Sequence, residues 1–136
     1  MDLQKYNFLH NDNGDILIID WVYSVMGGGA RNFAGALECM PDDILKSLVN
    51  WEEITYSPKI DLICLVRAFY LMLHKPERVI ERISSDTTDY DDIRKRAQGV
   101  LAFWESHAKS ESWDRILQDA ECLQYDSLIE KLEQLF

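Results

Sequence analysis

Residues 56–76 organise this chain, and they read YSPKIDLICLVRAFYLMLHKP. Pro58 suits the first turn of a helix, because the N–H that proline lacks is not needed there. Pro76 stands where the helix has to end, since proline cannot continue it. Between the two prolines, apolar side chains cover every side of a helical wheel. The pattern predicts a central helix over residues 58–75 that is buried all round and on which the other elements pack.

The composition describes an ordinary globular protein of one domain. The 136 residues are 47% hydrophobic and 28% charged, and a chain of this length can bury a core of its own. The central helix is shorter than the roughly 20 residues of a membrane span and contains Asp61 and Arg67. The net charge of −10 disfavours nucleic acid and anionic membrane surfaces as partners.

The cysteines indicate a reducing compartment. Cys39, Cys64 and Cys122 are odd in number and show no CxxC spacing, and Cys64 reads as a buried apolar residue of the central helix. Residues 1–4 have neither the basic start nor the apolar run of a signal peptide. We therefore expect an intracellular protein, cytoplasmic or nuclear, unless the chain was cut from a longer precursor.

A β-hairpin is predicted within residues 1–20. Two β-like runs, residues 6–10 and 15–20, flank the sequence Asn-Asp-Asn-Gly, and Asn-Gly between apolar runs is a strong hairpin signal. The oxygen-rich turn does not fit a calcium loop, because Gly14 is out of register and no bidentate Glu follows. Residues 20–43 form an irregular segment whose three consecutive glycines are not followed by the Lys-Ser/Thr of a P-loop.

Helices account for the other predicted elements. A short helix is expected from Asp42 to about Val49, and another over residues 77–83, followed by a loop. Three further helices are expected to begin after capping residues Asp89, Ser110 and Asp126. The side chains expected to face the core of these three helices are Ile93, Ala97, Val100, Leu101, Trp104, Ala108, Trp113, Ile116, Leu117, Ala120, Leu128, Ile129, Leu132, Leu135 and Phe136.

Three motifs in this order resemble the C-terminal lobe of a protein kinase. Residues 20–22, Asp-Trp-Val, are similar to the family's Asp-Phe-Gly. Residues 35–45, GALECMPDDIL, align without a gap with Gly-Thr-Pro-Glu-Tyr-Met-Ala-Pro-Glu-Val-Leu. Residues 61–66, DLICLV, resemble the Asp-x-Trp-Ser-Leu-Gly opening of the family's central helix. The motif resemblance covers residues 11–76, and the wording of residues 59–76 is also similar to kinase-like lobes of crinkler-type effectors.

The resemblance implies a mainly α lobe around a buried central helix, with a small N-terminal β-hairpin. Residues 20–43 would then be activation-segment-like and residues 77–136 a helical remainder of the same domain. Asp20 would hold the magnesium ion that bridges the nucleotide phosphates. Asp43 would pair with a buried arginine, and Asp61 would bind the backbone of a catalytic loop. From the residues alone, Asp20 can also be a strand-end acid satisfied by backbone N–H groups.

The chain departs from the family where catalysis is concerned. The 136 residues contain no Gly-rich phosphate loop, no phosphate-pairing Lys with its Glu and no His-Arg-Asp motif. Val22 and Ala36 replace the Gly and Thr of the two motifs, and the sequence between Asp20 and Asp43 offers no conventional activation-loop phosphosite. Positioning and charge stabilisation supply nearly all of the catalysis in phosphoryl transfer, and these departures remove both.

We therefore expect a catalytically inactive kinase-like lobe that acts as a protein-interaction or regulatory module, as a homodimer or with a protein partner. The alternative is a fragment of a Ser/Thr kinase that needs a separate N-terminal lobe and catalytic loop. A third reading is a nucleotide sensor that binds ATP without transferring phosphate. No cofactor is expected for the chain alone, and ATP and Mg²⁺ only if a kinase role is retained. The three histidines fall in different elements without a second ligand at helical spacing, which disfavours a zinc site.

Overall fold

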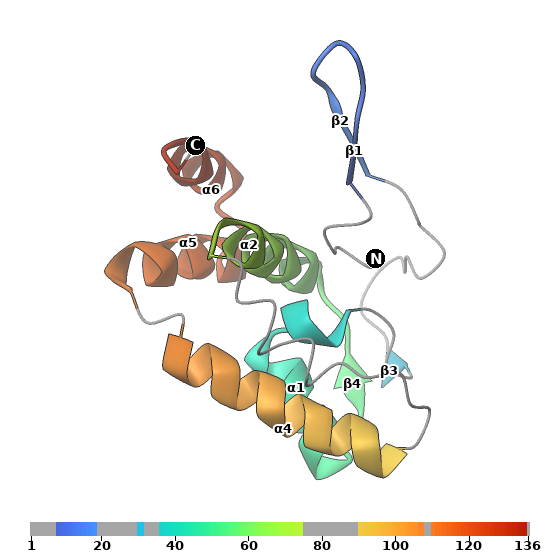
Figure 1. Cartoon of the computed structure of the whole chain (residues 1–136). Coiled ribbons are helices and arrows are strands. Elements are labelled where there is room, and N and C mark those ends of the chain that lie inside the picture. Colours follow the sequence, from blue (N-terminus) through green and yellow to red (C-terminus); the bar gives the residue numbers. More distant parts are fainter. Residues whose placement is uncertain (1–7, 19–29, 32–35, 75–89, 108–109, 136) are drawn as a thin grey trace.

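The computed structural model describes residues 8–18, 30–31, 36–74, 90–107 and 110–135 (Figure 1). The predictions for Asp20, most of residues 20–35, the helix over 77–83, the cap at Asp89, Ala108 and Phe136 lie outside these residues. The described chain is mainly helical, as predicted. Its elements are β1 (Phe8–His10), β2 (Ile16–Ile18), β3 (Ala30–Arg31), the 3-10 helix η2 (Leu37–Cys39), α1 (Asp42–Asn50), β4 (Ile54–Thr55), α2 (Pro58–His74), α4 (Tyr90–His107), α5 (Glu111–Glu121) and α6 (Tyr125–Glu133).

Helix α2 is the central element, with α1 and α4 on one side of it and α6 on the other (Figure 1). Six of its residues are buried, namely Ile60, Ile63, Cys64, Val66, Arg67 and Ala68. The prediction of burial on all sides is wrong for the last turn, where Met72 and Leu73 are exposed. Apolar composition expresses a preference for burial, but it does not say which neighbour covers each side chain.

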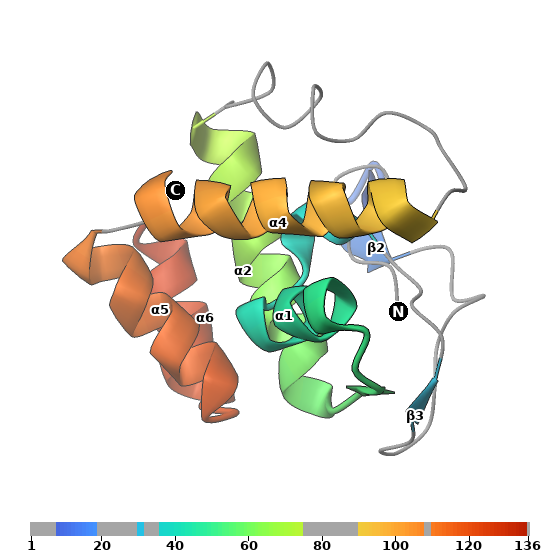
Figure 2. The ribbon, with the colours of Figure 1, turned by 90° about the horizontal axis from the view of Figure 1, so that it is seen from below.

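Two hydrophobic clusters share α2. Ile60, Cys64 and Ala68 recur every fourth residue and pack in a cluster with side chains of η2, α1 and α4. Ile63 and Val66 belong to a second cluster, which contains Trp113, Ile116 and Ala120 of α5 and Leu128 of α6. Figure 2 shows α4 running across the direction of α2, while α5 and α6 lie together on another side. Cys64 is only 2% exposed, which confirms the prediction of a buried apolar cysteine.

The predicted hairpin forms, and its turn is stabilised by Asn11. Strands β1 and β2 pair antiparallel with Leu9 opposite Leu17. The Asn11 side-chain oxygen accepts hydrogen bonds from the backbone N–H groups of Asn13 and Asp15 at 3.0 and 2.8 Å. Gly14 has φ +87°, a conformation that L side chains rarely adopt. Leu9 and Leu17 are about half exposed, so this face of the hairpin remains apolar and open.

Helices α1 and α2 begin at Asp42 and Pro58 as predicted, and of two predicted caps one is confirmed and one is wrong. Ser110 caps α5, accepting the backbone N–H of Trp113 at 3.4 Å. The cap predicted at Asp126 is wrong, because α6 already begins at Tyr125 after Gln124. Leu123 adopts a left-handed conformation (φ 57°), which turns the chain directly from α5 into α6. Asp126 therefore lies in the first turn, where its charge still suits the positive end of the helix dipole.

The apolar stripes of the last three helices are mostly as predicted. Ala97, Val100, Trp104, Trp113, Ile116, Ala120 and Leu128 are buried, and so is Phe103, which the spacing argument missed. Ile129 was expected in the core, yet it is 54% exposed. It follows Leu128 by one residue, and a step of one residue turns a helix by about 100°. Leu128 is turned into the second cluster, and Ile129 is thereby turned towards the surface.

Candidate functional site

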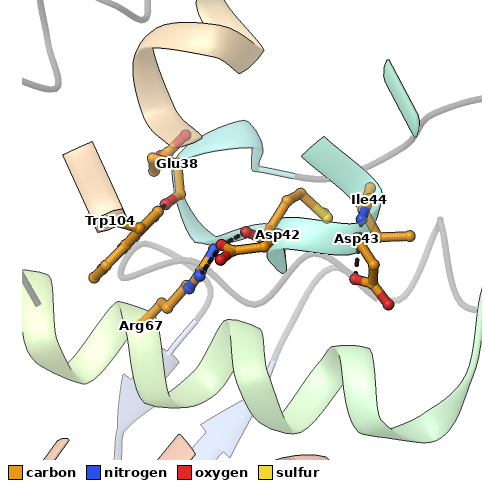
Figure 3. A network of polar contacts seen from close by, with 7 residues as sticks. Glu38, Asp42, Asp43, Ile44, Arg67 and Trp104 are labelled. Carbon is orange, nitrogen blue, oxygen red and sulfur yellow. Dashed lines mark hydrogen bonds and ion pairs between the residues drawn. The ribbon is translucent and has the colours of Figure 1, made fainter. Parts of the chain in front are cut away.

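A buried arginine ties four elements together. Arg67 lies in the middle of α2 and is only 5% exposed. Its Nη2 donates to Oδ1 of Asp42 on α1 at 2.5 Å, and its Nη1 donates to the carbonyl oxygen of Met40 (Figure 3). Both acceptors belong to the short stretch between η2 and the first turn of α1. The guanidinium therefore fastens this stretch to the central helix.

Trp104 of α4 completes the arrangement from the opposite side. The guanidinium carbon of Arg67 lies 4.6 Å from the centroid of the Trp104 ring, within the range of a cation–π contact. The Trp104 indole N–H donates to the carbonyl oxygen of Glu38 at 2.8 Å, a bond that Figure 3 also shows. One tryptophan thus contacts both the arginine and the backbone of η2. The group of Glu38, Met40, Asp42, Arg67 and Trp104 is called the Arg67 network below.

The Arg67 network is built for architecture. A buried charge is tolerated when it is paired and hydrogen-bonded, and Asp42 supplies the countercharge. Among the described residues, Nε of Arg67 has no hydrogen-bond acceptor. The other guanidinium contacts point inward, so the charge is not presented to a phosphate or carboxylate ligand. The network holds no nucleophile with an adjacent base, which covalent catalysis would need.

The structure describes two of the three acids named from the sequence, Asp43 and Asp61. Asp43 lies in the first turn of α1, where it forms an ion pair with Lys59 at 3.3 Å and accepts the backbone N–H of Ile44 at 2.9 Å. The expected pairing of Asp43 with a buried arginine is wrong by one residue, since Asp42 makes that contact. Asp61 is half buried in the first turn of α2. Asp20 lies outside the described residues.

Sequence reasoning noted Arg67 only as a charge inside the central helix. The sequence nevertheless indicates an ion pair for Arg67, because a lone arginine on an otherwise apolar helix needs a carboxylate partner. The sequence offered Asp42 and Asp43 as neighbours in one helical turn, and their spacing to Arg67 along the chain does not distinguish them. Trp104 was placed in the core correctly, but its role against Arg67 depends on how α4 crosses α2.

A surface pocket of about 530 Å³ lies where the end of α2 meets the start of α5. Tyr70, Leu73, His74, Ser110, Ser112, Trp113 and Leu135 line it. The rings of Tyr70 and Trp113 meet edge-to-face with centroids 5.0 Å apart, and the His74 ring lies 4.4 Å from that of Tyr70. Ser110 is already engaged as the cap of α5. The lining is mostly aromatic and apolar, with the polar groups of His74, Ser110 and Ser112 beside it.

The described part of the chain contains no group of three or more His, Cys, Asp or Glu side chains that could hold a metal ion. No helix in this part is long and apolar enough to cross a membrane.

Asp119 of α5 forms the second polar cluster. It accepts hydrogen bonds from Lys131 Nζ at 2.5 Å and from the Ser127 hydroxyl at 2.6 Å, both on α6. These two bonds favour the carboxylate and lower the pKa of Asp119 below its ordinary value, with Lys131 the larger cause. The cluster sets the rotation of α6 about its own axis, because residues 127 and 131 lie one turn apart on the same face.

No protein-family model matches the chain, and the searches of curated proteins and of solved structures found no match either. The resemblance to a kinase lobe therefore depends on the motifs within residues 11–76.

The Arg67 network predicts different effects for two adjacent aspartates. Asp42→Asn should lower the free energy of unfolding by about 1–3 kcal/mol, because a charge-assisted bond to a buried guanidinium is weakened. Asp43→Asn is the matched control and should change it by less than about 0.5 kcal/mol, since its pair with Lys59 is exposed. Urea denaturation monitored by tryptophan fluorescence measures both values. Equal effects of the two substitutions would contradict the assignment of Asp42 as the partner.

The Asp119 cluster predicts that loss of Lys131 changes the pKa of Asp119. Lys131→Met should raise the pKa of Asp119 towards its ordinary value, because the larger cause of the depression is removed. In the unchanged protein, the stabilisation from this carboxylate is present above the unfolded pKa near 3.8 and is lost as the pH falls through the depressed folded pKa. Carboxyl-carbon NMR titration measures the pKa. Lys46→Met removes an exposed cation of α1 that is not among the causes of the depression, and it should leave the pKa of Asp119 unchanged.

Proposed function

We propose that the chain is a catalytically inactive, protein-kinase-like lobe that acts as a protein-interaction module. The observation that carries the proposal is the set of large apolar side chains that stay exposed after both hydrophobic clusters have formed. They lie on the hairpin, after α1, in the last turn of α2, in the turn before α6 and on α6, and comprise Leu9, Leu17, Trp51, Met72, Leu73, Leu123, Tyr125 and Ile129. Contiguous apolar patches are typical of contact surfaces, and the adjacent pairs Leu9–Leu17 and Tyr125–Ile129 are the start of such patches.

The hairpin is the part best placed for self-association. Leu9 and Leu17 are cross-strand partners, so their side chains form one small apolar face. Within the described ranges, neither edge of this two-stranded sheet pairs with a further strand, and such edges can pair with a strand of another chain. In Figure 1 the hairpin extends away from the helices, where a second chain can reach it.

The absence of catalysis is inferred from the chemistry of the sequence. The 136 residues include neither the lysine that pairs with nucleotide phosphates nor the aspartate that accepts the substrate proton in this family. The described polar clusters do not replace them, because Arg67 and Lys131 are both held in ion pairs.

A second candidate function is that of a kinase fragment completed by separate segments. The observation in its favour is the anchoring of residues 38–42 to the central helix by Arg67. A kinase lobe fixes the end of its activation segment with a buried arginine in a comparable way, although here the contacting acid is Asp42.

Self-association should appear at micromolar concentration. The average mass from light scattering should rise above that of the monomer between about 1 and about 100 µM, the range of weak protein interfaces. The double variant Leu9→Asp, Leu17→Asp should stay monomeric, because four charges from two copies would meet at the shared face. Circular dichroism checks that the helices are intact. A strictly monomeric mass for the unchanged chain across this range would contradict the prediction.

Nucleotide binding distinguishes the module from the kinase fragment. For an inactive module we expect no heat of binding when the chain is titrated with ATP, with or without Mg²⁺. Asp20→Asn should then behave like the unchanged chain. Magnesium-dependent binding that disappears in Asp20→Asn would show that Asp20 keeps its family role, and would favour the kinase fragment.

A further inference from the structure

One face of α6 is apolar and exposed although the helix is firmly seated. Leu128 is 2% exposed in the second cluster, and Lys131 and Ser127 are bonded to Asp119 of α5. Tyr125 and Ile129 border the buried stripe of α6 on the side away from Ser127 and Lys131, and they are 52% and 54% exposed. They are four residues apart and so adjacent on the helix surface.

Carboxylates flank this face. Asp126, Glu130 and Glu133 of α6 are exposed, and Glu133 continues the row of Tyr125 and Ile129 at the same spacing of four. Residues 110–136 contain seven acidic and two basic side chains and thus carry half of the net charge of −10. The two basic ones, Arg115 and Lys131, are each held in an ion pair within α5 and α6. The acids that flank the apolar face remain uncompensated within this helix pair.

We propose that this face, formed by Tyr125 and Ile129 and flanked by Asp126, Glu130 and Glu133, binds a basic amphipathic helix of a partner protein. The apolar side of such a helix covers Tyr125 and Ile129. Its lysine or arginine side chains meet the flanking carboxylates, as charges beside the apolar seam do in paired helices. The inference rests on the proposed function of an interaction module and names the class of partner.

The negative charge beside Tyr125 and Ile129 favours a basic helix over other binding partners of this face. A second copy docked through the same face would bring the two acidic borders together, and like charges in close apposition oppose binding. Phosphate backbones and anionic lipid surfaces are repelled for the same reason. A basic helix satisfies both features, because it supplies apolar area and the missing positive charge.

The test uses the full chain and a defined probe. The probe is a fluorescent helical peptide of about 18 residues with leucine on one face and lysine on the other, long enough to form a helix. Its matched control carries glutamate in place of lysine. Ile129→Asp should weaken binding of the lysine peptide about tenfold or more, because an apolar contact is lost and a charge is buried. Glu130→Lys should weaken it about threefold or more and reduce its dependence on salt.

Control variants at other positions test whether the peptide binds this face of α6 or is attracted by the net charge of the whole chain. Leu17→Asp changes an equally exposed aliphatic residue on the hairpin, and Glu53→Lys makes the same change of charge at an exposed position after α1. Both should bind within about twofold of the unchanged chain, because neither position touches α6. Binding that responds to the α6 substitutions alone, and that the glutamate peptide does not show, supports the proposal.

Three results would overturn it. Equal weakening by the α6 variants and by their controls would mean that the peptide is attracted by overall charge alone. No binding of the peptide by a chain that self-associates through its hairpin would refute the α6 proposal and leave the interaction module standing. No binding by a chain that is also strictly monomeric would refute the α6 proposal and remove the support for the proposed function as well.

Discussion

The structure depends on the compensation of one buried charge. A guanidinium inside a hydrophobic cluster is unfavourable unless an opposite charge and hydrogen-bond acceptors come with it. Arg67 therefore requires that the backbone at Met40 and the carboxylate of Asp42 approach the central helix. The stretch between η2 and α1 is fixed in this way, and Trp104 then closes over it from α4. Segments that are distant in sequence are thus held together by the side chain of Arg67.

Polar and apolar groups have different roles in the interior and at the surface. The interior polar groups are used to hold elements together, with Arg67 on one side of α2 and Asp119 on the other. What remains at the surface is an excess of carboxylates and several apolar side chains. The proposed role as an interaction module rests on this surface.

The pairing expected for Asp43 shows what a motif alignment can miss. The alignment over residues 35–45 predicts that Asp43 pairs with a buried arginine, whereas in the structure Asp42 contacts the buried Arg67. The position differs by one residue, and a difference of one residue matters on a helix. Asp43 pairs with Lys59 at the surface, while Asp42, whose side chain is 42% exposed, reaches the buried Arg67, because adjacent residues are rotated by about 100°. A motif alignment without structural contacts cannot resolve such a rotation.

The sequence by itself determined the local elements: the helix from Pro58, the hairpin around Gly14, and the apolar stripe of Ala97, Val100 and Trp104. These are set by backbone preferences and by periodicity, which act over a few neighbouring residues. Only the tertiary structure decided which carboxylate pairs with the central arginine, which turn of α2 stays exposed, and how α6 is rotated to leave Ile129 outside. Those outcomes depend on contacts such as the bond between Asp119 and Lys131. Such contacts join elements whose relative orientation is not encoded in the spacing of either one.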